Sequence, residues 1–306
     1  MAHGPTYVDF SARPIVRLAG PEALDLMQRI STNDVRSLAV GSAVGTILTT
    51  DKGRIRDVLS LVRLAETELL LFGTLSERKD LAAWIERFVI MEDIKVQDAT
   101  DEFFRYQLLW PTRAMQGGEG GSLQSLASVF GGGGRTWLMA DPATGGKTVS
   151  LIGDKHLAGV VKLHLEREGF RRGDDESLRN FCVYYGLPVP GLELSIDYNP
   201  HEVGLLPLVS FTKGCYVGQE VIARLDTYKK VQRRLVSFEL SEKPAELPAR
   251  LAIGSEETGI LSSVVYSDEL ASWIGIGFVK PAFLEGAECA SYRGERAEGV
   301  ARLRKV

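Results

Sequence analysis

Residues 213–220 read Lys-Gly-Cys-Tyr-Val-Gly-Gln-Glu and bring a thiol, an ammonium group and two conformationally permissive glycines into one short turn. The apolar run 206–211 in front of the turn predicts a strand that ends at Thr212. The residues that follow, from 220 to 225, predict a helix. This composition is typical of a reactive site rather than of a hydrophobic core.

Cys215 carries the chemistry of this turn. We expect it just before a helix N-terminus, where unpaired N–H groups and the positive end of the helix dipole favour a thiolate. Lys213 adds a positive charge two residues away and would hold that thiolate. The alternative is that Cys215 is a small buried residue, as most free cysteines are.

Four segments resemble the YgfZ family of folate-binding proteins, and they occur in the same order along the chain. The family includes a mitochondrial iron–sulfur assembly factor and is related more distantly to T-protein, the aminomethyltransferase of the glycine cleavage system. The resemblance spans residues from about 15 to about 280 and is most specific in the segment that contains Cys215. The four segments are Ile-Ser-Thr-Asn-Asp-Val at 30–35, Gly-Arg-Ile-Arg-Asp at 53–57, Pro-His-Glu-Val-Gly-Leu at 200–205 and the motif at 213–220.

This resemblance implies an α+β fold in which a ring of three subdomains surrounds a central pocket for tetrahydrofolate, followed by a small antiparallel β-barrel. We therefore expect a T-protein-like region of two interleaved α+β subdomains over residues 1–232 and a barrel over residues 233–306. The tail supports the barrel independently, because short strands separated by Gly, Ser, Asp and Pro recur there. The predicted strands are 234–240, 249–253, 259–266, 273–279 and 288–292.

The resemblance also implies which residues form the site. Asp57 matches the first of two adjacent aspartates in the T-protein pattern, although Val58 replaces the second. Asn33 matches a loop that reaches the same pocket, but an Asn after a helix is also an ordinary turn former. Arg224 is expected either to pair with Glu220 one turn earlier or to face the pocket. Further cofactor contacts are expected from Tyr216, Gln219 and Glu220.

Position 184 departs from the family pattern. Relatives carry Arg-x-Glu-x-Gly where this chain has Cys-Val-Tyr-Tyr-Gly at 182–186, so Tyr184 stands in the place of the glutamate that pairs with the pterin. A phenol donates one hydrogen bond and stacks, but it does not accept two N–H groups as a carboxylate does. We therefore expect weak folate binding or a different ligand.

Three functional hypotheses follow from the resemblance. The first is an accessory factor that supports assembly or repair of iron–sulfur enzymes through Cys215, with client enzymes or assembly factors as partners. The second is a tetrahydrofolate-dependent aminomethyltransferase, in which Asp57 assists attack by a folate nitrogen and ammonia is released. The third is a non-catalytic folate-fold binding module, a hypothesis that the replacement of the pterin-pairing glutamate by Tyr184 supports. The motif cysteine and the missing second aspartate favour the first.

Composition limits the classes of function. At 306 residues the chain exceeds the size at which a single core usually stops growing, so two or three subdomains are expected. A net charge of −4 gives no reason to expect strong nucleic-acid binding. Three cysteines without paired spacing suggest neither disulfides nor a metal site. With no targeting segment at the N-terminus and no apolar run of about 18 residues, we expect no membrane association and a cytoplasmic location.

Other elements are predicted more locally. Strands over 43–50, 54–64 and 69–72 predict a meander, and Ser76 and Asp154 are expected to cap the helices that follow them. Gly169 is expected to end a helix, and the glycine-rich stretch of about 116–134 predicts a surface excursion. The predicted helices are 22–30, 77–91 and 155–168.

Overall fold

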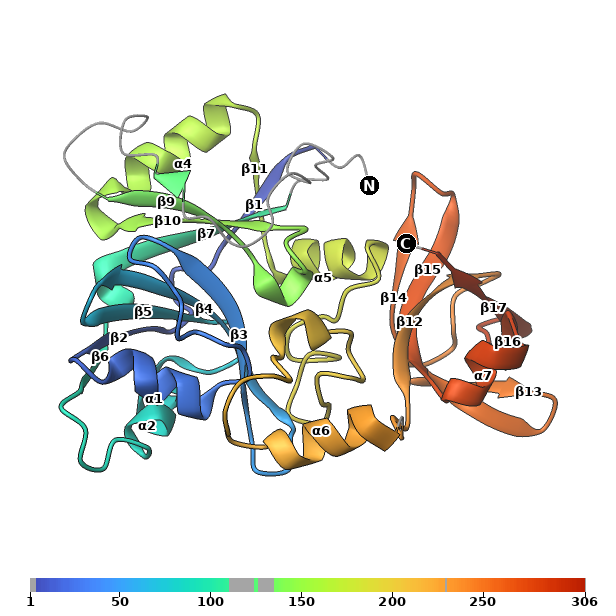
Figure 1. Cartoon of the computed structure of the whole chain (residues 1–306). Helices are drawn as coiled ribbons and strands as arrows, with labels where there is room; N and C mark the ends of the chain where they lie inside the picture. The colour runs from blue at the N-terminus through green and yellow to red at the C-terminus, as the bar shows by residue number, and fades with distance from the viewer. Residues whose placement is uncertain (1–3, 110–123, 126–134, 229, 306) are drawn as a thin grey trace. The chain divides into compact units, whose positions relative to one another are not determined.

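The computed structural model describes residues 4–109, 124–125, 135–228 and 230–305, and its elements are shown in Figure 1. The chain divides into two compact units. The larger unit comprises residues 4–175 and 207–219, and the barrel unit comprises residues 176–206 and 220–306. The chain thus leaves the larger unit, returns to it for the segment that contains the motif, and leaves it again.

A five-stranded antiparallel sheet forms the first half of the larger unit, in the order β3-β4-β5-β2-β6. Its strands are β2 (Ile15–Ala19), β3 (Ala43–Thr49), β4 (Ile55–Ala65), β5 (Glu68–Gly73) and β6 (Lys95–Asp98). The helices α1 (Ala23–Ile30) and α2 (Arg78–Glu86) pack on one face of this sheet. The predicted meander of β3, β4 and β5 is confirmed.

A second sheet has six strands in the order β11-β1-β7-β10-β9-β8. Its strands are β1 (Thr6–Asp9), β7 (Phe103–Leu109), β8 (Gln124–Ser125), β9 (Thr136–Ala140), β10 (Val149–Asp154) and β11 (Arg171–Gly173). The helix α4 (Ala158–Arg167) packs on its outer face. Short 3₁₀ helices η1 (Thr100–Glu102), η3 (Pro142–Thr144) and η4 (Lys155–Leu157) connect these elements.

The two sheets pack against each other, so the larger unit is layered helix, sheet, sheet, helix (Figure 1). Alternation along β5 explains this, because Leu69 and Leu71 contact the helices while Leu70 and Phe72 contact the second sheet. A strand that is buried on both faces reads as a continuous apolar run, as β5 does.

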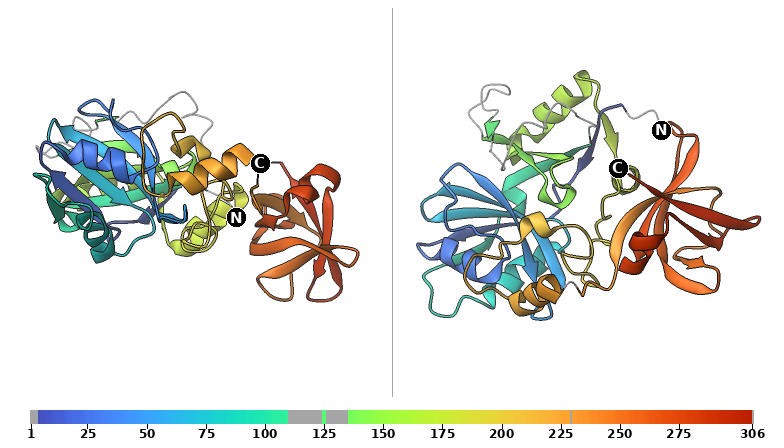
Figure 2. Two further views of the ribbon diagram at one scale, coloured as in Figure 1. Left: turned by 60° about the horizontal axis from the view of Figure 1, so that its bottom comes forward. Right: turned by 45° about the vertical axis from the view of Figure 1, so that its right-hand side comes forward.

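The barrel unit contains a closed barrel of six antiparallel strands in the order β12-β15-β14-β13-β16-β17, visible in both views of Figure 2. The predicted antiparallel barrel is therefore confirmed, and β17 is a strand that the sequence analysis missed. The short helix α7 (Pro281–Gly286) places Phe283 in the barrel core. The strands are β12 (Arg234–Leu240), β13 (Ala249–Ile253), β14 (Glu256–Ser267), β15 (Ser272–Val279), β16 (Cys289–Arg293) and β17 (Glu298–Arg304).

Before the barrel, the helices α5 (Asp175–Tyr184) and α6 (Gln219–Tyr228) flank the 3₁₀ helix η5 (Leu206–Leu208). The predicted strand over 206–211 is wrong, because the 3₁₀ helix η5 occupies residues 206–208 and residues 209–212 are not in a strand. Pro207 gives the physical reason, since it has no N–H to contribute to a ladder. The predicted helix after the motif is confirmed as α6.

Two predicted caps are wrong. The amide of Ser76 donates to Asp57 and α2 has no side-chain cap, and α2 ends at Glu86 rather than at 91. Asp154 accepts hydrogen bonds from Arg135 instead of capping η4. Gly169 does end α4, with a left-handed φ of +85°. Of the glycine-rich stretch 116–134, only Gln124–Ser125 is described, so that prediction lies outside the described residues.

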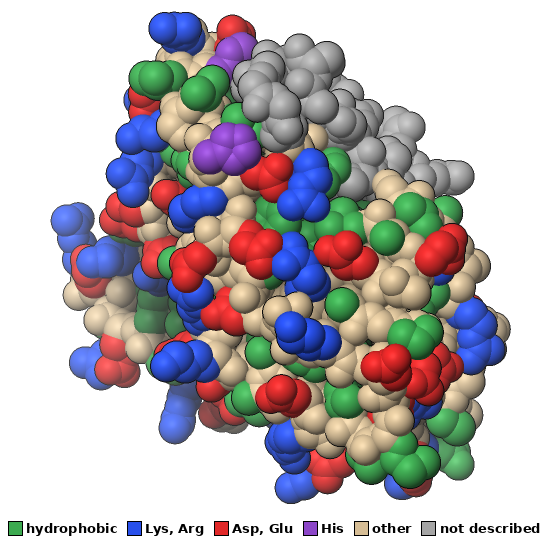
Figure 3. Space-filling view, turned by 90° about the vertical axis from the view of Figure 1, so that its left-hand side faces the viewer, with side chains coloured by type: hydrophobic (Ala, Val, Ile, Leu, Met, Phe, Trp, Pro, Cys, Tyr) green, Lys and Arg blue, Asp and Glu red, His purple; other side chains and the backbone are tan. Residues whose placement is uncertain are grey.

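Surface charge and helix length add two observations. On the face seen in Figure 3, Lys and Arg side chains are interspersed with Asp and Glu. Among the helices of the described ranges, none is long and apolar enough to cross a membrane.

Glu193 fastens the chain between α5 and η5 to the barrel. Its side chain is 1% exposed. One carboxylate oxygen accepts hydrogen bonds from the hydroxyls of Ser262 and Ser263 on β14, at 2.5 and 2.7 Å. The other accepts from the amide of Val189 at 3.2 Å. A buried carboxylate with three donors is a strong local anchor.

We expect Glu193→Ala to lower the free energy of unfolding by about 2 to 4 kcal/mol, because the donors of Val189, Ser262 and Ser263 lose their buried acceptor. Urea denaturation followed by tryptophan fluorescence measures the change. Glu239→Ala, at an exposed position of β12, is the matched control and should change stability by less than about 0.5 kcal/mol. Equal effects of the two substitutions would contradict this role for Glu193.

Candidate functional site

Lys213 joins the motif to the end of α1. Its side chain is 8% exposed, and its Nζ donates hydrogen bonds to the carbonyl oxygens of Ser31 at 2.8 Å and Asn33 at 2.5 Å. Burial lowers the pKa of Lys213 to about 8. These two hydrogen bonds therefore hold the turn that contains the motif against the chain that follows α1.

Tyr216 lies next to this lysine. The Nζ of Lys213 is 5.4 Å from the centroid of the Tyr216 ring, within the range of a cation–π contact. Tyr216 is itself buried, and burial raises the pKa of its hydroxyl to about 12. Tyr216 thus remains a neutral phenol at neutral pH.

A second attachment holds the motif at its other end. Thr49 on β3 donates its hydroxyl to the carbonyl oxygen of Val217 at 2.5 Å. Gly218 has a φ of +82°, and a Cβ at this position would run into the carbonyl oxygen of Thr50. Position 218 therefore requires glycine, for both its conformation and its close approach to the turn between β3 and β4.

Cys215 lies between these two attachments and is exposed. The alternative of a buried core cysteine is therefore wrong. The helix α6 begins at Gln219, four positions later, so Cys215 takes no part in its first turn, where the dipole effect is concentrated. Two of the ammonium hydrogens of Lys213 are directed to backbone carbonyls. That Lys213 activates the thiol stays a prediction.

Asn33 has the contacts of a turn former. Its Nδ2 donates to the carbonyl oxygen of Gly45 at 2.8 Å, and its Oδ1 accepts from the amide of Asp34 at 2.9 Å. Its own carbonyl accepts from Lys213. These contacts favour the turn-forming alternative over a role in binding a cofactor.

Asp57 is fully buried and surrounded by backbone donors. Its carboxylate accepts hydrogen bonds from the amides of Val58, Thr74, Leu75 and Ser76, at 2.7 to 3.0 Å. These bonds fix the chain between β5 and α2. A catalytic role for Asp57 stays a prediction, and its contacts favour a structural one.

Tyr184 ends α5 in the barrel unit and lies beside two charged groups. The guanidinium of Arg304 is 5.0 Å from the centroid of the Tyr184 ring and donates to the Tyr184 carbonyl oxygen at 2.6 Å. Burial, followed by a hydrogen bond to Glu269, raises the pKa of Tyr184. Glu269 lies in the turn between β14 and β15, so a carboxylate from a distant segment stands next to the Tyr184 hydroxyl.

The segment 200–205, one of the four that resemble the YgfZ family, contacts α6 through His201 and the chain after α6 through Glu202. The Nε2 of His201 is 3.0 Å from the carbonyl oxygen of Ile222 on α6. Glu202 is buried, accepts from Arg233 at 3.0 Å and also accepts from the amide of Asn199 at 2.9 Å. This segment is structural in its described contacts.

On α6, Arg224 and Glu220 form the predicted pair, but loosely. Their nearest nitrogen and oxygen are 4.0 Å apart, and the side chains are 70% and 87% exposed. The amide of Gln219 donates to the carbonyl oxygen of Tyr216 at 3.2 Å, which links the motif to the start of the helix.

The predicted site residues are drawn from both units. The larger unit holds Lys213, Cys215, Tyr216, Gln219, Asn33 and Asp57, and the barrel unit holds Tyr184, Glu220 and Arg224. The sequence analysis missed Thr49, Glu269 and Arg304, whose contacts come from distant segments and leave no local signal. Over the described residues, no group of three or more His, Cys, Asp or Glu side chains is placed to hold a metal ion.

The pKa of Lys213 predicts a dependence of stability on pH. Because this pKa falls from an ordinary 10.5 to about 8 in the folded chain, the unfolded chain binds more protons between pH 8 and pH 10.5. The contribution of Lys213 to stability therefore rises with pH across that window. Denaturation of Lys213→Met at several pH values should show a shallower rise than the wild type.

Lys52→Met, at an exposed position, is the control for this experiment and should keep the slope of the wild type. A wild-type slope in Lys213→Met would refute the assignment of the buried ammonium group.

Comparison with known proteins places this geometry in context. Residues 3–114 match the family model of the GCVT N-terminal domain. An aminomethyltransferase of Aquifex aeolicus is 28% identical over 288 residues, which cover 90% of this chain and 77% of that protein. A chloroplastic protein of Arabidopsis thaliana, provisionally named a transferase, is 25% identical over 91% of this chain, and the match spans 66% of the plant protein.

A solved structure shows the fold. The glycine cleavage system aminomethyltransferase T from Bartonella henselae matches 99% of this chain and 85% of its own, with a TM-score of 0.78 and 15% sequence identity. The predicted α+β fold is thus confirmed as that of T-protein, with a closed six-stranded barrel at its end. In sequence, the chain is similar to aminomethyltransferases and to the GCVT N-terminal domain.

Proposed function

We propose that this chain binds a reduced folate and transfers a folate-linked one-carbon unit, with aminomethyl transfer as the first candidate reaction. The observation that carries the proposal is the T-protein fold, which matches 99% of the chain. Relatives named aminomethyltransferases, 25% to 28% identical over about nine-tenths of the chain, support the same reaction. In that reaction a carrier-bound aminomethyl group gives its methylene to folate, and ammonia is released.

Tetrahydrofolate, when bound, supplies the nucleophilic nitrogen. The chain itself must supply an acceptor for the two N–H groups of the pterin edge, and the phenol of Tyr184 does not accept both as a carboxylate does. We propose that the carboxylate of Glu269, which is hydrogen-bonded to the Tyr184 hydroxyl, supplies this acceptor. The guanidinium of Arg304 lies over the face of the Tyr184 ring. We propose that the pterin edge binds at Tyr184 and Glu269.

We expect the wild type to bind tetrahydrofolate with a dissociation constant of about 1 to 100 μM in anaerobic calorimetry. Tyr184→Glu should bind about tenfold more tightly, because it restores a carboxylate, and Glu269→Gln about tenfold more weakly. Glu239→Gln, on an exposed face of the barrel, should match the wild type. If neither the wild type nor Tyr184→Glu binds, folate is not the ligand.

Transfer is measured separately from binding. A lipoyl protein loaded with an aminomethyl group is mixed with the chain and tetrahydrofolate, and ammonia release is followed. Binding with release supports the transferase. Binding without release favours the second candidate below or a non-catalytic folate-binding module.

The second candidate is an accessory factor for iron–sulfur enzymes, with those enzymes or their assembly factors as partners. The observation that favours it is the exposure of Cys215 between two anchored points, Lys213 and Gly218. The hydrogen bonds of Asp57 point the same way, since they leave this carboxylate poorly placed for transfer chemistry. We propose a cytoplasmic location, which would keep the exposed thiol reduced.

In cells that lack the gene, we expect Cys215→Ser to restore iron–sulfur enzyme activity at least about tenfold less well than the wild type, since a hydroxyl is a far weaker nucleophile than a thiolate. Cys289→Ser, at a partly exposed position on the barrel, is the matched control and should rescue fully. Folate affinity of the Cys215→Ser protein should be unchanged. Full rescue by Cys215→Ser would eliminate the thiol mechanism.

A further inference from the structure

The wall of the barrel is weakly closed along the boundary between β13 and β16, which we call the seam. Over the described residues of the barrel, these two strands pair only at Ala252 and Ser291. The hydroxyl of Ser291 also donates to the carbonyl oxygen of Ala252 at 3.4 Å. On its other side each strand is paired along its whole length, β13 with β14 and β16 with β17. The seam is therefore the least paired boundary of the barrel.

The chain before β13 bulges away from the seam. Pro244 forms an isolated bridge with Gly294. The amide of Ala245 donates to the carbonyl oxygen of Arg293 at 3.1 Å. Between the bridge of Pro244 and the pairing of Ala252, three positions lie along β16 (291 to 294) and eight along the other side (244 to 252). The longer side must bend outward, and a pocket of about 640 Å³ is lined by residues of both sides.

The wall of this pocket that β16 and β17 form is held in place by Glu242. The hydroxyl of Tyr292 donates to the carbonyl oxygen of Glu242. The carboxylate of Glu242 accepts from the amide of Ala297 at 3.2 Å. Because these bonds fix the wall before any ligand arrives, a ligand binds without the free-energy cost of ordering it.

Backbone groups of both strands face the seam. The carbonyl of Arg293 is used across the seam by Ala245, so the N–H of Arg293 lies on the same side of β16. Ala252 lies opposite Ser291, and backbone groups alternate along a strand, so the N–H and C=O of Arg250 also point to the seam. Arg250 and Arg293 are not paired with each other. Open strand edges of this kind are where an extended peptide adds as a further strand.

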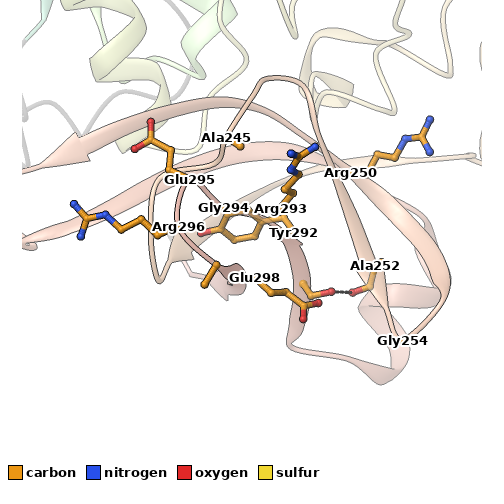
Figure 4. A pocket seen from close by; sticks show the side chains of 12 residues that line it. Ala245, Arg250, Ala252, Gly254, Tyr292, Arg293, Gly294, Glu295, Arg296 and Glu298 are labelled. Atoms are coloured by element: carbon orange, nitrogen blue, oxygen red, sulfur yellow. Dashed lines mark hydrogen bonds between the residues drawn. The ribbon is translucent and has the colours of Figure 1, made fainter.

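Three arginines stand around the opening. Arg293 and Arg296 make no ion pair within the part of the chain that the structure describes, and Arg250 has only a loose pair with Glu257 at 3.8 Å. Exposed pairs of this length contribute little. Figure 4 shows the three guanidinium groups pointing in different directions. They are therefore placed for charges spaced along a chain rather than for one compact anion.

Positive charge prevails at this pocket. Of the two glutamates that line it, Glu295 is already paired with Lys243 at 2.6 Å, which leaves Glu298 against three arginines. The pocket also lacks the feature that single-stranded nucleic acids use, an exposed aromatic ring for stacking bases, because Tyr292 is 3% exposed.

We propose that the seam binds an extended acidic segment of a partner protein. Its backbone pairs with the open edges of β13 and β16, and its carboxylates meet Arg250, Arg293 and Arg296. Alternate side chains of an extended segment lie on one face about 7 Å apart, which suits cations that stand apart from one another. This binding is independent of the folate binding proposed above.

The test measures the binding of labelled peptides of about eight residues to the full chain by fluorescence anisotropy. One peptide alternates Glu and Thr, and the other alternates Lys and Thr. We expect the acidic peptide to bind at least about tenfold more tightly than the basic one, and Arg293→Gln and Arg296→Gln each to weaken its binding about threefold. Arg302→Gln, at an exposed position of β17 outside the pocket, is the matched control and should bind as the wild type does.

Acidic peptides with methyl groups on alternate backbone nitrogens, made in both registers, test the backbone pairing, because they keep the charges and lose N–H donors. At least one of the two should bind about tenfold more weakly than the parent peptide. Unchanged binding of both methylated peptides, equal loss in Arg302→Gln and Arg293→Gln, or no binding of the acidic peptide would overturn the inference. Tighter binding of inorganic polyphosphate or single-stranded DNA, weakened by the same substitutions, would also overturn it in favour of a general polyanion site.

Discussion

The ammonium group of Lys213 connects parts of the chain that lie 182 positions apart in sequence, by donating to the carbonyl of Ser31. The segment 207–219 returns to the larger unit for only thirteen residues, and this hydrogen-bonded lysine is one of the contacts that hold it there. Burying a lysine costs free energy, as its lowered pKa records. This buried lysine lies two positions before Cys215, whose thiol is exposed.

Most polar residues that look catalytic in the sequence direct their polar atoms to the backbone. Lys213 donates to two carbonyls, Asn33 bonds within its turn, and Asp57 accepts from four amides. These hydrogen bonds between side chains and backbone hold the neighbouring loops in place. Leaving a buried polar group without a partner would cost free energy. Among the predicted site residues, Cys215, Glu220 and Arg224 are exposed instead.

The sequence predicts those elements whose signals are local. Turn residues between short apolar runs located five of the six barrel strands, and the turn at residues 51–53 together with the apolar run 69–72 located β3, β4 and β5. The strand predicted over 206–211 is wrong because its apolar residues follow the pattern of a strand, whereas Pro207 has no N–H to contribute to a strand ladder. Contacts between distant segments, such as Glu269 with Tyr184 or Glu193 with Ser262 and Ser263, have no period or motif from which to infer them.

Val58 limits how far the chemistry of T-proteins extends to this chain. It stands where the T-protein pattern has a second aspartate, and it is fully buried within β4, opposite Ile47 on β3. Its amide already donates to Asp57, whose other acceptor positions take three more amides. A carboxylate at position 58 would point to the opposite face of β4 from Asp57, beside Ile47, and burial there would disfavour its ionised form. Position 58 therefore offers no second carboxylate, and the carboxylate of Asp57 is fully occupied by backbone amides.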